Sequence, residues 1–150
     1  MRDQTGFGSM SDPTHQDALV VVQLARWNTE LGVTESIGFL RGGQFDDWQG
    51  FKSRHGPGTE GYHHLVNICQ FYETVGTLWK HGLVNETLLF DWLGISPVWE
   101  LVKPLAQGDR ADRGVPTLWE NFEAMAEAQT AAAARADQAP TRRPVPVTTG

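Results

Sequence analysis

Residues 62–106, YHHLVNICQFYETVGTLWKHGLVNETLLFDWLGISPVWELVKPLA, decide the fold of this chain. Apolar side chains recur in this stretch at spacings of three and four residues, which places them on one face of an α-helix. The first such stripe consists of Leu65, Ile68, Tyr72, Val75 and Trp79. Gly76 flanks this stripe and costs roughly 1 kcal/mol relative to alanine inside a helix, so we expect another helix to approach closely there.

The same stretch contains the ends of three consecutive helices. His81-Gly82 ends the first helix, because glycine readily takes the left-handed conformation that closes a helix. Asn85 is expected to cap a short second helix that stops at Gly94. Ser96 followed by Pro97 predicts the start of a third helix, which Pro104 should shorten or kink.

Helical signals continue on both sides of this stretch. Upstream, Asp12 is expected to cap a first helix that reaches Gly32, and two short helical segments follow before residue 56. Thr59 is a candidate cap for the central helix. Downstream, residues 107–115 indicate a polar loop, after which Thr117 and Glu120 match the capping box that opens a last helix.

These signals predict an all-α fold, a compact bundle of about five or six helices. A chain of 150 residues suits one domain, since domains usually hold about 100–200 residues. We expect a disordered leader at residues 1–11, a single helical domain at 12–136, and a disordered proline-rich tail at 137–150.

Four short motifs carry a family resemblance over residues 65–126. They are Phe71-Tyr72-Glu73, Gly82-Leu83, Trp99-Glu100 with Lys103-Pro104, and Asn121-Phe122-Glu123. With them the chain resembles a family of small bacterial helical proteins catalogued only as a domain of unknown function. The resemblance implies an all-helical fold and brings no established activity. Members of that family often carry a membrane-spanning helix before this region.

The overall composition restricts the classes of partner. A net charge of −6 argues against general nucleic-acid binding, which needs clustered Lys and Arg. The single cysteine excludes an intrachain disulfide and any cysteine-rich metal site. The longest apolar run, residues 18–22, is far shorter than the ~20 residues that cross a bilayer, so we expect no stable membrane insertion. We expect a cytoplasmic protein.

No spacing in the sequence predicts a cofactor or a metal. Gly56, Gly58 and Gly61 match a dinucleotide fingerprint, but no strand precedes them and Glu60 would repel phosphates, so a glycine-rich loop is the better interpretation. His63 and His64 are adjacent and point about 100° apart on a helix. Only tertiary contact with another histidine such as His81 would build a metal site from them.

Glu73 and Glu100 are the candidate catalytic residues. Both follow aromatic residues on helices that should touch, and carboxylates in a shared apolar pocket can have raised pKa values for acid–base work. The favoured interpretation is structural, with each carboxylate paired to a cation or to a backbone donor at a helix end. Cys69 lies on the apolar stripe and is expected to be buried and inert.

The leading functional hypothesis is a non-enzymatic interaction or regulatory module that acts on a protein partner or on a second copy of the chain. Trp48, Phe51 and Trp119 are its candidate residues, as an exposed aromatic patch. The proline-rich tail at residues 141–147 could dock as an extended peptide in an aromatic groove, but this pattern is generic and a solubilising disordered end is the favoured interpretation.

Two alternatives remain open. The first is a small-ligand-binding or hydrolase-like enzyme that uses Glu73, Glu100 and a histidine in a central helical pocket. The second is peripheral membrane association through the first helix, against which the acidic net charge counts.

Overall fold

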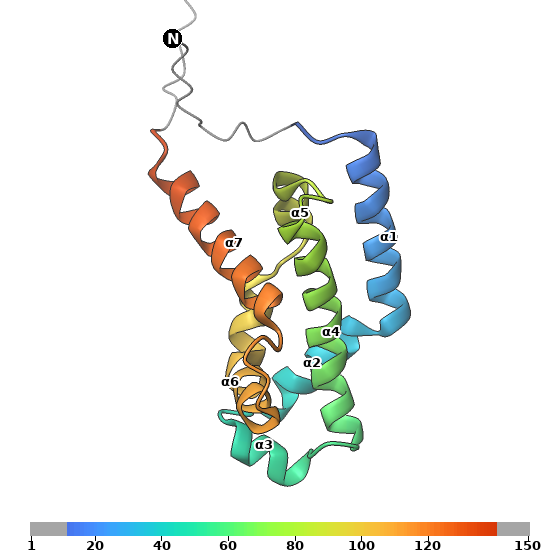
Figure 1. The fold of residues 1–150 in the computed structure, drawn as a ribbon, viewed down its shortest axis with the longest axis vertical. Coiled ribbons are helices and arrows are strands. Elements are labelled where there is room, and N and C mark those ends of the chain that lie inside the picture. Colours follow the sequence, from blue (N-terminus) through green and yellow to red (C-terminus); the bar gives the residue numbers. More distant parts are fainter. Residues whose placement is uncertain (1–11, 141–150) are drawn as a thin grey trace, which may run out of the picture.

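The structure, a computed structural model, describes residues 12–140, which form seven α-helices and no strand (Figure 1). The expected all-α class is confirmed. The expected count of about five or six helices is wrong, because residues 12–140 form seven; the short segments expected before residue 56 and after Asn85 are both full helices, α3 and α5, of seven residues each. The helices are α1 (His15–Leu31), α2 (Val33–Gly43), α3 (Trp48–Arg54), α4 (Glu60–Lys80), α5 (Glu86–Trp92), α6 (Ser96–Arg113) and α7 (Glu120–Gln138).

Two of the expected regions lie outside the described residues. These are the leader at residues 1–11 and residues 141–150 of the proline-rich tail. Within residues 12–140, none of the helices is both long enough and apolar enough to span a bilayer.

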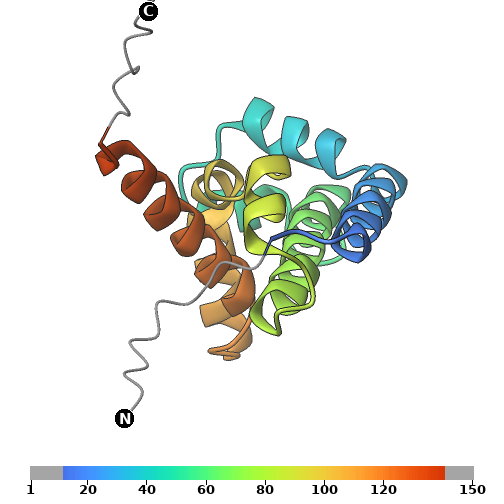
Figure 2. The ribbon, with the colours of Figure 1, turned by 90° about the horizontal axis from the view of Figure 1, so that it is seen from above.

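Helix α4 is the centre of the bundle. It packs most extensively against α7 and α2, while α3 packs against α6. Helices α1 and α7 lie on opposite sides of α4, and the end of α7 projects away from the bundle (Figures 1 and 2). The predicted stripe on α4 is confirmed, since Leu65, Ile68 and Val75 are fully buried and Tyr72 is nearly so.

Gly76 allows a close contact between α4 and α7. A Cβ atom at this position would lie 2.7 Å from the backbone oxygen of Asn121 on α7. Any side chain here would force α4 and α7 apart, so the predicted close approach is confirmed.

Several predicted helix ends are confirmed. The side chain of Thr59 accepts a hydrogen bond from the Tyr62 backbone N–H at 3.3 Å and caps α4. The side chain of Asn85 accepts one from the Leu88 N–H at 3.0 Å and caps α5. Gly82 adopts the left-handed conformation, with φ of 68°, directly after α4.

The start of α1 differs from the prediction. Thr14, not Asp12, is the cap, and its side chain and that of Asp17 bond each other's backbone N–H in a capping box. Asp17 also accepts a hydrogen bond from the Asn85 N–H at 3.1 Å, which ties the start of α1 to the start of α5. The capping box that forms therefore includes a residue, Asp17, that also makes a tertiary contact with Asn85.

Helix α6 is longer than the sequence predicted. Ser96 is its first residue rather than its cap, and the helix runs without a break through Pro104 to Arg113. The expected polar loop at residues 107–115 is therefore wrong over most of its length. The inward side chains Leu105, Ala106 and Asp109 are buried, and these contacts outweigh the backbone hydrogen bond that Pro104 cannot donate.

Helix α7 does not begin with the predicted capping box of Thr117 and Glu120. The residue before its first turn is Trp119, whose φ is 63° and whose side chain makes no capping bond. The free N–H groups at this end are taken by Glu73 of α4 instead. At its other end α7 reaches Gln138, two residues past the boundary expected at 136.

Candidate functional site

The Glu73 carboxylate binds the N-terminus of α7. Its two oxygens accept hydrogen bonds from the backbone N–H groups of Asn121, at 3.3 Å, and Phe122, at 2.9 Å. A negative charge is favourable at this end of a helix because the peptide dipoles point their positive ends there. Glu73 therefore has the structural role that the sequence favoured, as an acceptor of backbone donors at a helix end.

Glu100 lies elsewhere and is exposed. It lines a surface depression of about 340 Å³ between α6 and α7, together with Lys103, and a second depression beside Arg41 of α2. Glu73 lines neither of these depressions. The pocket that the enzyme hypothesis expected the two glutamates to share is therefore not found at Glu100.

The candidate metal-binding histidines are not brought together. His63 and His81 are exposed, whereas His64 is half-buried, with its Nδ1 atom 2.9 Å from the Ser36 hydroxyl and its ring stacked on Phe39. Asn67 donates a hydrogen bond to the same hydroxyl at 3.0 Å. Among residues 12–140, no group of three or more His, Cys, Asp or Glu side chains is placed to hold a metal ion.

The predicted aromatic patch is not exposed. Trp48 is 7% exposed and Phe51 is fully buried, because both pack between α3 and α6 in the core. Trp119 is partly buried and packs against the same core. The prediction that these three residues form an exposed interaction surface is therefore wrong. The side chain of Trp48 fills the space that Gly108 leaves on α6, where a Cβ atom would clash with it.

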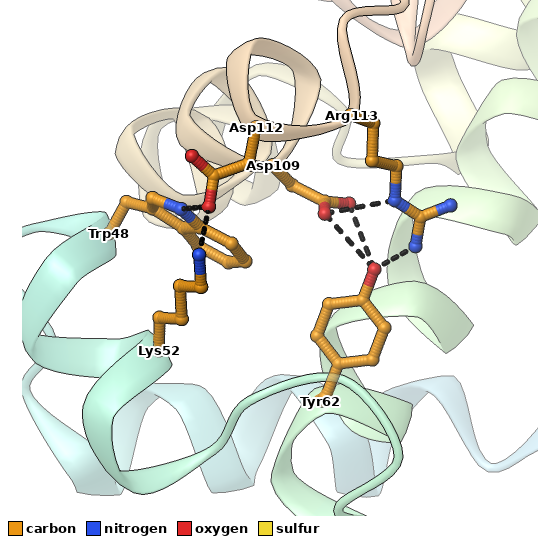
Figure 3. Close-up of polar contacts among 6 residues, drawn as sticks. All are labelled: Trp48, Lys52, Tyr62, Asp109, Asp112 and Arg113. Atoms are coloured by element: carbon orange, nitrogen blue, oxygen red, sulfur yellow. Dashed lines mark hydrogen bonds and ion pairs between the residues drawn. The ribbon is translucent and has the colours of Figure 1, made fainter.

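A set of polar contacts that the sequence did not predict, here called the polar network, joins α3, α4 and α6 (Figure 3). Its centre is Asp109, which is 2% exposed. The Tyr62 hydroxyl donates to the two Asp109 oxygens at 3.0 and 3.2 Å, and Arg113 Nε donates to Oδ1 at 3.0 Å. The Arg113 guanidinium also donates to the Tyr62 hydroxyl. Each of these three side chains is therefore bonded to the other two.

The second half of the network lies nearer the surface. Asp112 accepts a hydrogen bond from the Trp48 indole N–H at 2.8 Å and forms an ion pair with Lys52. These contacts hold α3 on the end of α6 (Figure 3).

The two aspartates of this network have pKa values shifted in opposite directions. Burial raises the pKa of Asp109 above its ordinary value, and the negative charge of Asp112 acts in the same direction. The hydrogen bonds from Lys52 and Trp48 lower the pKa of Asp112. A raised carboxyl pKa can indicate an acid catalyst, but Asp109 is almost fully enclosed and already bonded to two side chains. The arrangement is suited to holding helices together.

Cys69 and the glycine-rich loop match their structural predictions. Cys69 is fully buried, and this burial raises the pKa of its thiol, so the thiolate is strongly disfavoured. The loop that follows α3 contains Gly58, which has φ of 89°. A helix, not a strand, precedes this loop, so the geometry of a dinucleotide site is missing.

An apolar depression forms an open groove between α5 and α7, here called the α5–α7 groove. Its apolar lining comes from Pro13 before α1, Leu88 and Phe90 of α5, and Ala133 of α7. Its volume is about 460 Å³, within the range of roughly 300–1,000 Å³ that is usual for ligand pockets.

Gln129 of α7 forms hydrogen bonds with the backbone of the connection between α5 and α6, beside this groove. Its side-chain oxygen accepts hydrogen bonds from the N–H groups of Ile95 and Ser96, each at 2.8 Å. Its amide nitrogen donates to the Leu93 carbonyl at 2.7 Å. One side chain of α7 thus satisfies the free backbone groups of the α5–α6 connection. These bonds join α7, which forms one wall of the groove, to the connection that follows α5, which forms the other wall.

The α5–α7 groove has an acidic rim. Among the described residues, those that line it and are ionisable are Glu86 and Asp91, with no Lys, Arg or His. Glu86 accepts a hydrogen bond from the Trp79 indole at 2.8 Å, which fixes its position, and Asp91 is exposed. An apolar floor with two carboxylates at its edge favours an occupant that carries both apolar and positively charged groups.

Sequence reasoning missed both the polar network and the α5–α7 groove. Asp109 and Arg113 are four residues apart, a spacing that indicates a helical turn on which the two side chains form an ion pair. Helix α5 also gave a signal, because Leu88, Leu89 and Phe90 are consecutive and cannot all face one core. Leu89 is the fully buried member of the three, which leaves its two neighbours to line the groove.

The fold and these sites define a small all-helical protein in which one candidate catalytic residue, Glu73, binds a helix N-terminus and the other, Glu100, is exposed. The chain belongs to the family described as domain of unknown function DUF4760, whose sequence profile matches residues 13–129. The resemblance predicted over residues 65–126 lies within that match and is confirmed. No curated protein and no solved structure gives a significant match to this chain.

Proposed function

We propose that this chain is a non-enzymatic interaction module that binds a short segment of a partner protein in the α5–α7 groove. The observation that carries the proposal is the groove itself, with its apolar lining from Leu88, Phe90 and Ala133 and its acidic rim. Apolar depressions that expose such side chains on a small protein commonly mark binding sites.

The chemistry of the rim specifies the partner segment. Glu86 and Asp91 favour a segment with Lys or Arg beside two or three apolar side chains. The net charge of −6 supports a basic protein segment over a nucleic acid, whose phosphates the same carboxylates would repel. The single cysteine, which rules out any intrachain disulfide, supports a cytoplasmic setting.

The projecting half of α7 gives this proposal a matched pair of variants. Ala133 and Ala134 are adjacent and both exposed. Ala133 lines the α5–α7 groove, whereas Ala134 lines the depression on the other side of α7, facing α6. Replacing either alanine with lysine adds the same charge and the same length of side chain, but only Ala133→Lys places it in the groove.

The test is selection from a random twelve-residue peptide library displayed on phage, with the full chain immobilised. We expect the recovered peptides to combine basic and apolar residues. Their affinity should fall at least tenfold for Ala133→Lys and stay unchanged for Ala134→Lys. Peptides that bind both variants as well as the original chain would overturn the proposal, as would a library that yields no binder above background.

A further inference from the structure

We infer that residues 142–147 of the chain bind the α5–α7 groove of the same molecule and compete there with a partner segment. This inference rests on the proposed function and names an occupant for the same groove. The sequence of these residues is Arg142-Arg143-Pro144-Val145-Pro146-Val147, two positive charges followed by alternating proline and valine.

The charge of this segment complements the rim of the groove. Residues 139–150 contain two arginines and no acidic residue, whereas the groove contributes Glu86 and Asp91 and no basic residue. The arginines can therefore pair with the rim while the apolar residues contact the lining. Residues 1–11 match less well, since they carry one positive and one negative charge that offset each other.

Residues 142–147 can also reach the α5–α7 groove, because they follow the end of α7 closely and are long enough to run back along it. Ala133 lies in the groove and α7 ends at Gln138, five residues later, which is roughly 7.5 Å along a helix axis. Residues 142–147 span roughly 19 Å if extended at about 3.1 Å per residue, so they can fold back along α7 to the groove. Proline also lowers the entropy lost when an extended peptide binds.

Because residues 142–147 belong to the same molecule as the groove, they should lower the apparent affinity of a partner segment by an amount that can be calculated. A short connection within one chain produces an effective concentration of about 1 mM, so a segment whose own dissociation constant is about 0.1 mM would weaken an external competitor roughly tenfold. The same segment would bind a second molecule only at high protein concentration.

The experiment uses a nitroxide spin label on the full chain, attached through Thr149→Cys. The native Cys69 is fully buried, so the label attaches at the tail alone. We expect paramagnetic broadening of the backbone amide signals of Leu88, Phe90 and Ala133 in ¹⁵N spectra. Broadening should disappear with Ala133→Lys and persist with Ala134→Lys, and it should weaken when salt is raised and the charges are screened.

Two further samples separate the possible occupants. In a mixture of ¹⁵N chains without label and spin-labelled chains without ¹⁵N, broadening at the groove would show that the tail of a second copy binds, which overturns the inference. Absence of broadening at the groove in the singly labelled chain would also overturn it.

A charge-reversed chain separates this inference from the proposed function. In Arg142→Glu/Arg143→Glu, the peptides selected from the library should bind roughly tenfold more tightly, because their competitor no longer fits the acidic rim. Unchanged peptide affinity would refute the tail as competitor while leaving the groove as a binding site. Failure of every peptide to bind would refute the proposed function, and the spin label would still report on the tail.

Discussion

Glu73→Gln tests whether the Glu73 carboxylate secures α7 on the central helix. The substitution keeps the size of the side chain and one acceptor oxygen but removes the charge. Both carboxylate oxygens accept backbone N–H groups in the structure, from Asn121 and Phe122. Glutamine can satisfy one of them and presents a donor to the other.

The size of the effect follows from these two contacts. A hydrogen bond to a charged acceptor contributes about 1.5–3 kcal/mol, against about 1 kcal/mol for a neutral one. The favourable interaction of a negative charge with a helix N-terminus adds about 0.3–1 kcal/mol. Because Glu73 is half-buried, we take the lower part of these ranges and expect a loss of about 1.5 kcal/mol in the free energy of unfolding. For a chain of this length that is a fall of roughly 3–6 °C in Tm.

Urea denaturation followed by tryptophan fluorescence measures this loss. Glu100→Gln is the matched control, because it makes the same chemical change at an exposed position and should stay within about 0.5 kcal/mol of the original chain. The slope of the transition should be equal for all three proteins, since none changes the surface exposed on unfolding. Equal stabilities of the two variants would refute the capping role of Glu73. Peptide binding in the α5–α7 groove should be unchanged in Glu73→Gln, since the groove lies farther along α7.

Three other sites, Gly76, Asp109 and Asp112, make predictions that urea denaturation can check. Gly76→Ala should lower the free energy of unfolding by about 1–3 kcal/mol, because its Cβ would lie 2.7 Å from the backbone oxygen of Asn121. Gly42→Ala, whose Cβ would meet nothing within 4 Å, should instead stabilise by about 0.5 kcal/mol, and equal effects would contradict the close contact. Burial raises the pKa of Asp109, so at pH values between the unfolded-state pKa and this higher native pKa the native state holds a proton that the unfolded state has released. Stability relative to Asp109→Asn should therefore fall as pH rises through this interval. The pKa of Asp112 is lowered, so stability relative to Asp112→Asn should instead be lost as pH falls below the ordinary aspartate range; a difference independent of pH in either case would refute the assignment.

The sequence predicted best those features that depend on neighbours in the chain. Thr59 and Asn85 were identified as caps because a capping side chain needs only the N–H three residues ahead of it. The stripe along α4 was likewise visible from spacing alone, since an amphipathic helix repeats its apolar side chains every three or four residues.

The predictions failed where a distant contact decided the outcome. Residues 107–115 are polar and were expected to form a loop, yet Asp109 is bonded to Tyr62, which lies 47 residues earlier in the chain. That bond, with Arg113 one turn away, supports a helix over polar residues and past Pro104. The opening of α7 has the same cause, because its N–H groups are satisfied by Glu73 rather than by Thr117.

The aromatic residues show a second limit. A short run such as α3 indicates a helix but does not reveal which neighbour covers each face. Trp48 is buried because Gly108 on α6 provides room for its indole ring and Asp112 accepts its N–H. Neither residue is near Trp48 in the sequence, so its burial could not be derived from local spacing. The α5–α7 groove escaped prediction for the same reason, as its walls lie about forty residues apart.

The few side chains that the α5–α7 groove can bury imply weak binding of the tail, and a tail that competes with a partner must bind weakly enough to be displaced. Each apolar side chain buried from water contributes about 1.5–3 kcal/mol, and ordering it costs about 0.5–1.5 kcal/mol. Two valines and a screened arginine pair then leave only a few kcal/mol, too little to hold two separate molecules together at ordinary concentrations. Within one chain the same few kcal/mol suffice, because the connection has already removed most of the translational cost. A partner with one more apolar anchor gains at least 1.4 kcal/mol, or tenfold in affinity, and can displace the tail.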